Sequence, residues 1–168
     1  DDVKDLSQRD KMDYYMSGWR NLRDYAEKHY PGKFNVLLGA EVAFPHRPSD
    51  FLIYGPDEDF FLNNPDMYLH EKYWTGSLCH NNNLLFIQAH PFRNNCAVTE
   101  DWVIDGIEVY NGHPGQRNHN RIAEEWLKEY PNYIATSGSD HHDEDGYPDS
   151  GIITDFPIET NKQLVEVL

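Results

Sequence analysis

The stretch Leu-Leu-Phe-Ile-Gln-Ala-His at residues 84–90, followed by Pro91, decides the fold class. A short apolar run that closes on a histidine and a proline is typical of a buried strand that ends at the edge of a sheet. Similar runs, each of which we expect to form a strand, lie at residues 34–42, 51–55, 104–110, 133–136 and 151–154.

Four other segments place their apolar residues at helical spacing. These predicted helices lie at residues 10–30, 66–80, 117–129 and 160–168. Short apolar strands that alternate with helices predict an α/β architecture with a mainly parallel sheet. At 168 residues, the chain has the length of one domain.

The charge balance limits what the chain binds. It has 29 acidic and 14 basic residues, and a net charge of −15. Such a surface repels phosphate backbones, which argues against nucleic acid as a partner. A solvated surface accounts for most of this charge, but acidic clefts also attract cations.

Cysteine usage and hydropathy predict the compartment. Cys79 and Cys96 form no Cys-x-x-Cys pattern, and we interpret them as reduced thiols of a cytoplasmic protein. No run of about 18 apolar residues is present, so we expect no membrane span, and no signal peptide is visible. The sequence makes no prediction about the oligomeric state.

Three of the predicted strands end on residue types that bind metal ions. Glu41 and His90 each end a strand, and Asp140 with His142 follows a third. The carboxyl ends of parallel strands lie on one side of a sheet or barrel, so we expect these side chains to meet. Mixed imidazole and carboxylate ligands suit Zn, Mn or Fe better than Ca or Mg. We therefore take these four residues as candidate metal ligands and catalytic residues.

The segment Ser-Gly-Ser-Asp-His-His at residues 137–142 has two interpretations of equal weight when taken alone. It is either a polar turn whose aspartate caps the next segment or part of a metal site. The partners Glu41 and His90 favour the metal site. In a locally extended loop, His142 projects on the same side as Asp140, and His141 projects on the other.

Other catalytic patterns are absent or incomplete. Aligning Gly146 with the glycine of an EF-hand loop puts Ile152 where a bidentate glutamate is required, which excludes that motif. The sequence has no Gly-x-x-x-x-Gly-Lys loop and no Gly-x-Ser-x-Gly elbow. A Ser139 nucleophile with His141 or His142 is conceivable, but no pattern supplies an orienting group or an oxyanion hole.

Four motifs occur in a characteristic order. They are Leu-Leu-Gly-Ala-Glu at residues 37–41, Gln-Ala-His-Pro-Phe-Arg at 88–93, Asp-Gly-Ile-Glu-Val-Tyr-Asn at 105–111 and Gly-Ser-Asp-His-His at 138–142. Over about residues 34–155 the chain resembles the polymerase and histidinol phosphatase (PHP) family of metal-dependent phosphoesterases.

The resemblance implies a fold, a metal site and a reaction. The fold is a distorted (β/α)7 barrel with two or three divalent metal ions at the carboxyl ends of its strands. Glu41 would bridge metal ions, and His90, Asp140 and His142 would be ligands. The implied reaction is hydrolysis of a phosphate ester.

The chain departs from the family pattern at two places. The family begins with a His-x-His pair after its first strand and continues with an Asp-His element, and neither occurs here. We therefore expect residues 1–168 to form a PHP-like domain whose first strand or strands lie upstream of Asp1. The family also often carries a histidine where this chain has Asp50. Asp50 is thus a further candidate metal ligand, with capping of a turn as the alternative, and His46 is a weaker candidate for the same role.

Four further residues near these motifs are candidate substrate-binding residues. A guanidinium at Arg93 would hold a phosphate oxygen, although a surface ion pair is the alternative. Glu108 and Asn111 follow a strand, where Glu108 would orient a ligand or the substrate. His113 lies on the next loop and would line the cleft.

These observations predict metal-dependent hydrolysis of a small phosphate ester by metal-activated water. The missing His-x-His pair supports a different class, a non-catalytic metal-binding or interaction domain. A third reading keeps the metal ions but changes the reaction to hydrolysis of an amide or cyclic amide, because barrels host many chemistries.

Overall fold

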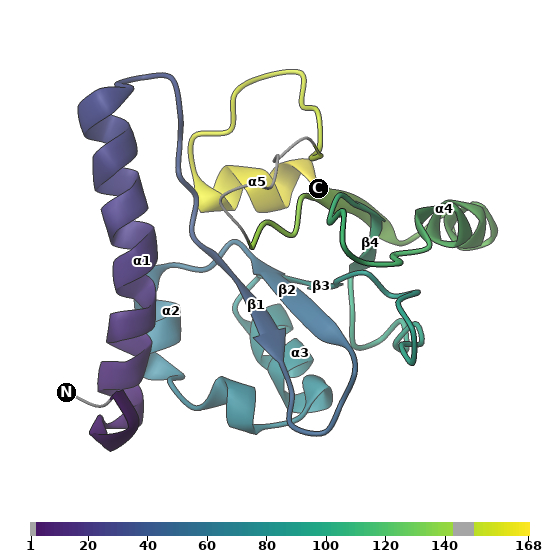
Figure 1. Ribbon diagram of the computed structural model, residues 1–168, viewed down its shortest axis with the longest axis horizontal. Helices are drawn as coiled ribbons and strands as arrows, with labels where there is room; N and C mark the ends of the chain where they lie inside the picture. Colours follow the sequence, from purple (N-terminus) through teal and green to yellow (C-terminus); the bar gives the residue numbers. More distant parts are fainter. Residues whose placement is uncertain (1–2, 143–149) are drawn as a thin grey trace.

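The computed structural model describes residues 3–142 and 150–168 as an α/β protein built on a five-stranded sheet (Figure 1). The α/β prediction is confirmed. The strands lie side by side in the order of the sequence. They are β1 (Gly39–Ala43), β2 (Asp50–Tyr54), β3 (Leu85–Gln88), β4 (Gly106–Asn111) and β5 (Ile134–Gly138).

Helices lie at both ends of the sheet and against it. α1 and α2 are at the β1 end, and α4 is at the opposite end (Figure 1). The helices of the described residues are η1 (Val3–Asp5), α1 (Gln8–His29), α2 (Glu58–Asn63), η2 (Met67–Leu69), α3 (Lys72–Asn81), α4 (Asn120–Glu129) and α5 (Asn161–Val167). None of them is long and apolar enough to cross a membrane.

Side-chain caps fix where two of the predicted helices begin. At the start of α1, Ser7 Oγ accepts a hydrogen bond from the Asp10 N–H at 3.2 Å. At the start of α5, Thr160 Oγ1 accepts one from the Gln163 N–H at 3.1 Å. Each cap satisfies a backbone donor that has no partner inside the helix.

The sheet is mixed, and the prediction of a mainly parallel sheet is wrong for its first three strands. β2 runs antiparallel to both β1 and β3, whereas β3, β4 and β5 are parallel. The connection from β1 to β2 spans only residues 44–49. That is too short for the crossover of a dozen or more residues that a parallel pair requires.

The sheet is also open within the described residues. β1 and β5 each have one neighbouring strand, and no barrel closes over residues 3–142 and 150–168. The predicted α/β class is therefore confirmed. The described residues form an open sheet and do not close into the expected distorted (β/α)7 barrel.

The two faces of the sheet differ in polarity. Phe51, Ile53 and Phe86 share one face and are each at most 1% exposed. The Phe51 and Phe86 rings stack with centroids 4.8 Å apart, and Met16 of α1 belongs to the same core. Burial of each such side chain contributes about 1.5–3 kcal/mol. This apolar face anchors the strands, and the opposite face carries the ionisable residues described below.

Three element boundaries differ from the sequence pattern. The run at residues 34–42 becomes a strand only from Gly39, and Phe34 is 62% exposed. Residues 151–154 form no strand, because no neighbouring strand pairs with them in the described residues, and Ile153 is fully exposed. The helix predicted at residues 66–80 is interrupted at His70, whose backbone is extended, so η2 and α3 are separate.

Candidate metal centre

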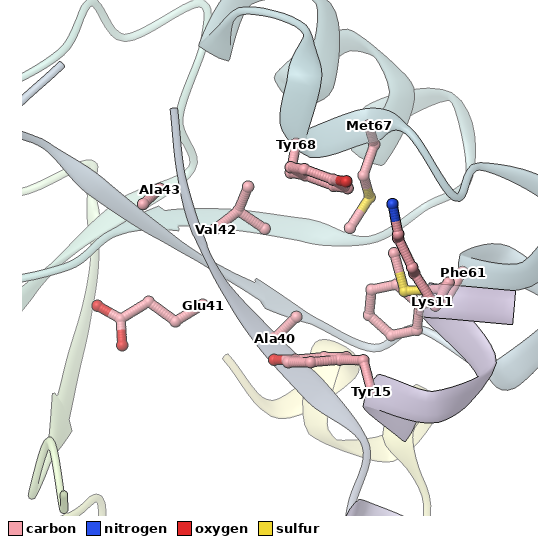
Figure 2. Close-up of a pocket in the computed structure, with 10 residues that line it drawn as sticks. Lys11, Tyr15, Ala40, Glu41, Val42, Ala43, Phe61, Met67 and Tyr68 are labelled. Atoms are coloured by element: carbon pink, nitrogen blue, oxygen red, sulfur yellow. The ribbon is translucent and has the colours of Figure 1, made fainter. Parts of the chain in front are cut away.

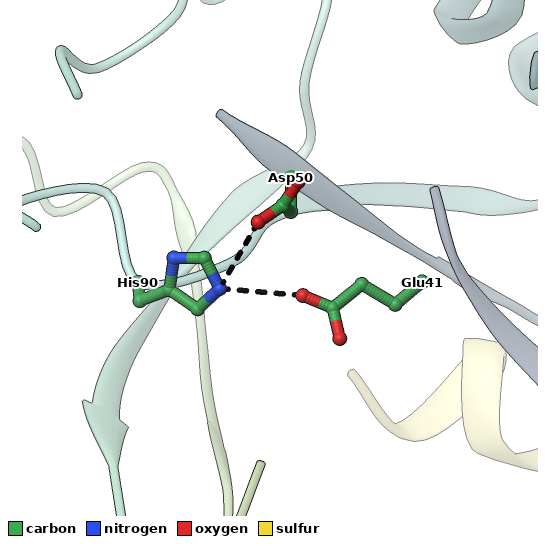
Figure 3. Close-up of side chains that lie close together, drawn as sticks. All are labelled: Glu41, Asp50 and His90. Carbon is green, nitrogen blue, oxygen red and sulfur yellow. Dashed lines mark hydrogen bonds and ion pairs between the residues drawn. The ribbon is translucent and has the colours of Figure 1, made fainter. Parts of the chain in front are cut away.

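Three side chains on the polar face converge: Glu41, Asp50 and His90 each offer a ligand atom within 4.8 Å of the others. Figure 3 shows both carboxylates directed at the same nitrogen of the imidazole. His90 Nε2 lies 3.2 Å from Glu41 Oε1 and 3.6 Å from Asp50 Oδ2. The His90 side chain is 2% exposed, and those of Glu41 and Asp50 are 39% and 29% exposed. We call this group the carboxylate–histidine trio.

The antiparallel strand β2 brings the trio together. Glu41 pairs with Leu52, and Asp50 precedes Leu52 by two residues, so both carboxylates project from one face. Because β2 runs against its neighbours, its first residue lies beside the last residues of β1 and β3. The Ala89 N–H donates to the Asp50 carbonyl at 3.0 Å, which places His90 next to Asp50.

No arginine or lysine among the described residues forms an ion pair with the trio. Among the described residues, the only ion-pair partner of Glu41 and Asp50 is His90, and a single Nε2–H serves two carboxylates incompletely. Burial raises the pKa of Asp50, and the nearby charge of Glu41 raises it further. A divalent cation between the three groups would compensate both carboxylates, and one imidazole with two carboxylates is a ligand set that Zn, Mn or Fe accepts. The residues therefore fit a metal ion.

The backbone of His90 is held in an uncommon conformation. Its φ is +29°, which non-glycine residues rarely adopt. The His90 N–H donates to Glu108 Oε2 at 2.9 Å, and this bond fixes the turn after β3. His90 Nδ1 is buried and has no hydrogen-bond partner among the described residues. Strain of this kind gathers at functional sites.

A bulge in β4 directs a second polar residue to the same face. The register with β5 shifts between Glu108 and Tyr110, so Asn111 can face the same side as Glu108 despite the odd spacing. Asn111 Nδ2 donates to Glu108 Oε2 at 2.9 Å. Burial raises the pKa of Glu108, while the hydrogen bonds from Asn111 and the His90 N–H oppose that rise. Glu108 therefore orients its neighbours and is not part of the trio.

Asp140 lies two residues beyond β5, as His90 does beyond β3, but its neighbours differ. Its carboxylate forms a short ion pair with Arg93 Nη2 and accepts a hydrogen bond from Asn111 Nδ2 at 3.2 Å. Arg93 Nε donates to Asn118 Oδ1 at 2.7 Å, and Nη2 reaches Asn111 Oδ1 at 3.3 Å. We call Arg93, Asn111, Asn118 and Asp140 the Arg93 network.

The Arg93 network neutralises Asp140. The Asp140 side chain is 5% exposed. Burial alone would raise its pKa, but the hydrogen bonds from Arg93 and Asn111 outweigh burial and hold the pKa below its ordinary value. The backbone of Asp140 is left-handed like that of His90, with a φ of +49°. Asp140 is thus an ionised carboxylate that already has a cation.

The remaining candidate histidines lie outside the trio. His142 Nδ1 is 2.8 Å from the Asp140 carbonyl and 3.2 Å from Asp140 Oδ1, and its side chain is 62% exposed. The His113 ring lies 5.5 Å from that of His142. His141 and His46 are exposed. The structure therefore brings His113 and His142 to the border of the Arg93 network.

A groove of about 340 Å³ lies on the other side of β1, toward α1. Figure 2 shows Ala40 and Val42 directed into it and the Glu41 carboxylate directed away from it, as strand alternation requires. Tyr15 lines the groove, and burial raises its pKa, with Glu41 adding to the rise. Glu41 thus separates an apolar groove from the polar face.

Sequence reasoning does not single out Asn118, which is 8% exposed and bonds to both Arg93 and Asn111. An isolated asparagine before a helix has no local signal beyond loop propensity. Its role follows from how the loop after β4 folds back over Asn111. The sequence does not predict the Arg93–Asp140 pair either, because these residues are 47 positions apart.

Comparison of the chain with protein-family models, curated proteins and solved structures found no significant match.

Proposed function

We propose that this protein hydrolyses a small phosphate ester with a metal-activated water. One observation carries the proposal: Glu41, Asp50 and His90 converge within 4.8 Å, and neither carboxylate forms an ion pair with an arginine or lysine among the described residues. Three protein ligands leave a coordination position open, which distinguishes catalytic zinc sites from closed structural sites.

The residues around the trio supply the other parts of such a reaction. A bound divalent ion would lower the pKa of water and offset charge on the phosphoryl group. Glu41 and Asp50 remain reachable by solvent, so substrate has access, while the buried His90 is fixed by Glu108. Arg93 Nη1 makes no hydrogen bond within residues 3–142 and 150–168, so it is available to a phosphate oxygen.

The PHP resemblance is part of this proposal. It accounts for Glu41 on β1 and for His90 and Asp140 just past the ends of β3 and β5. On this proposal the five strands would be part of the wall of a distorted barrel. Of the two or three ions that it implies, the described residues form a ligand group for one, the trio.

A non-catalytic metal-binding domain is the second candidate. The observation that favours it is the ion pair of Asp140 with Arg93, which removes one carboxylate from metal binding. An amide hydrolase would use the same trio and differs only in the substrate.

The experiment compares metal content and hydrolysis for wild-type protein, His90→Ala and His70→Ala. His70 is a matched control, because it is a partly exposed histidine stacked on Trp74. With Mn or Zn added, we expect wild type and His70→Ala to bind metal and cleave phosphomonoesters or phosphodiesters. We expect His90→Ala to lose at least about 100-fold in metal affinity and to lose the activity.

The substrate panel distinguishes the alternatives. Metal bound through His90 without any hydrolysis would identify a non-catalytic domain. Cleavage of amides but not of phosphate esters would identify an amide hydrolase. Full metal content and rate in His90→Ala would show that the trio is not the site.

A further inference from the structure

We propose that the Arg93 guanidinium takes the place of a second metal ion at Asp140, so that residues 3–142 and 150–168 bind one divalent ion, at the trio. This inference rests on the proposed metal site and concerns how many ions it holds. It gives Arg93 a second role besides contact with the substrate, which is to neutralise Asp140.

The first step is the chemistry of Asp140. Its position two residues past β5 matches that of His90 past β3, and His142 Nδ1 lies 3.2 Å from its Oδ1. A carboxylate beside an imidazole is a metal-ligand pair. Yet the carboxylate of Asp140 already has a guanidinium and the amide of Asn111 as donors, and its side chain is 5% exposed.

The second step is the anchoring of Arg93. Its Nε is held by Asn118 Oδ1 at 2.7 Å, and Asn118 is itself held by Asn111, to which its Nδ2 donates at 2.8 Å. The Arg93 side chain is 20% exposed. Because Asn118 binds its Nε and Asp140 binds its Nη2, the guanidinium is held in place, whereas the side chain of a surface arginine is mobile. The cation at Asp140 is therefore built into the fold.

The third step is the contrast with the trio. Asp50 and Glu41 have no arginine or lysine partner among the described residues, and the three ligand atoms there lie within 4.8 Å. One cation is lacking at the trio and one is supplied at Asp140. A single divalent ion at the trio would offset the carboxylates of Glu41 and Asp50, as Arg93 offsets that of Asp140.

The test counts metal ions per chain by titration calorimetry and elemental analysis with Mn²⁺ or Zn²⁺. Wild type, Arg93→Lys and the control Arg121→Met, an exposed position on α4, should bind one ion. Arg93→Met should bind two, because Asp140 then lacks its cation. The double variant Arg93→Met with Asp140→Asn should return to one.

A second measurement keeps the test decisive if Arg93→Met does not fold. Asp140→Asn preserves hydrogen bonding to Arg93 and should bind metal with a dissociation constant within about threefold of wild type, while Asp50→Asn should weaken binding at least tenfold. Loss of metal in Asp140→Asn would overturn the inference.

The remaining outcomes separate this inference from the proposed function. Two ions in wild type, or one ion in a folded Arg93→Met, would overturn the inference and leave phosphate-ester hydrolysis untouched. No ion in wild type would overturn both. One ion in wild type without hydrolysis would support the inference and count against the enzymatic proposal.

Discussion

Two aspartates on the same face of the sheet have opposite surroundings. Asp50 belongs to the trio, where its carboxylate adjoins Glu41 and has only His90 as an ion-pair partner among the described residues. Asp140 belongs to the Arg93 network, where a guanidinium and an asparagine amide bind its carboxylate. The difference lies in the cation that the fold supplies: Asp140 has a guanidinium beside it, whereas Asp50 lies in a group that could hold a metal ion.

The pKa values of the two carboxylates express this difference. Burial and the charge of Glu41 raise the pKa of Asp50. Burial acts in the same direction on Asp140, but Arg93 and Asn111 reverse the result and lower its pKa. The two carboxylates of the trio therefore repel each other, whereas in the Arg93 network the charge of the Asp140 carboxylate is already offset by the guanidinium.

The largest expected effect comes from removing the cation of the Arg93 network. Arg93→Met leaves the carboxylate of Asp140 buried without its ion-pair partner. Breaking a buried pair on one side is strongly unfavourable, so we expect the free energy of unfolding of the metal-free protein to fall by about 3 kcal/mol. Urea unfolding in the presence of a chelator measures this change.

Arg121→Met is the matched control for stability, since Arg121 is exposed and we expect a change within about 0.5 kcal/mol. Equal stabilities of Arg93→Met and Arg121→Met would show that the Asp140 pair is a surface contact. The distinction between the two aspartates would then be lost.

A smaller effect is expected at Glu108, which links the two regions. Its Oε2 accepts hydrogen bonds both from the His90 N–H and from Asn111 Nδ2. Glu108→Leu leaves both buried donors without that acceptor, which should cost about 2 kcal/mol of stability and weaken metal binding about tenfold.

Glu108→Gln is the control that separates charge from hydrogen bonding. Its amide oxygen can occupy the place of Oε2 and keep both bonds, so we expect stability within about 1 kcal/mol of wild type. Calorimetric unfolding and metal titration of the two variants provide the comparison. If Leu and Gln behave alike in metal affinity, Glu108 does not position His90.

Local sequence patterns predict the elements of this fold better than their directions. The runs around residues 84–90 and 104–110 form strands because short apolar segments bury well in a sheet. Strand direction depends on connections, and the short link at residues 44–49 was the available signal for an antiparallel pair. Residues 151–154 are as apolar as a strand, but strand formation requires a neighbour that no local pattern reveals.

The candidate site was predictable to a similar extent. Glu41 and His90 lie close together as expected, but Glu41 is in the middle of β1 and does not end the strand as the sequence pattern predicts. Asp50 joins them because β2 is antiparallel, which places a strand start beside two strand ends. The partner of Asp140 was not predictable, because Arg93 reaches it across the sheet through contacts that depend on the tertiary fold.

The smallest expected effect, and the one that bears most directly on the two aspartates, is the pH dependence of stability without metal. The raised pKa of Asp50 means that the folded state holds its proton to higher pH than the unfolded state does. Its contribution to stability therefore falls as pH rises above the ordinary value of 3.8. The lowered pKa of Asp140 acts in the opposite sense, because its stabilising contribution is present above 3.8 and is lost as pH falls through the lowered pKa.

Urea unfolding of Asp50→Asn and Asp140→Asn between about pH 3 and pH 8 measures both slopes. At neutral pH we expect Asp50→Asn to be more stable than wild type and Asp140→Asn to be less stable, with both differences shrinking toward acid pH. Hydrogen bonding is largely kept by an asparagine at each position, so the curves isolate the charge. Parallel curves for the two variants would mean that the trio and the Arg93 network carry equivalent counter-charge, and the assignment of the metal ion to the trio alone would lose its electrostatic basis.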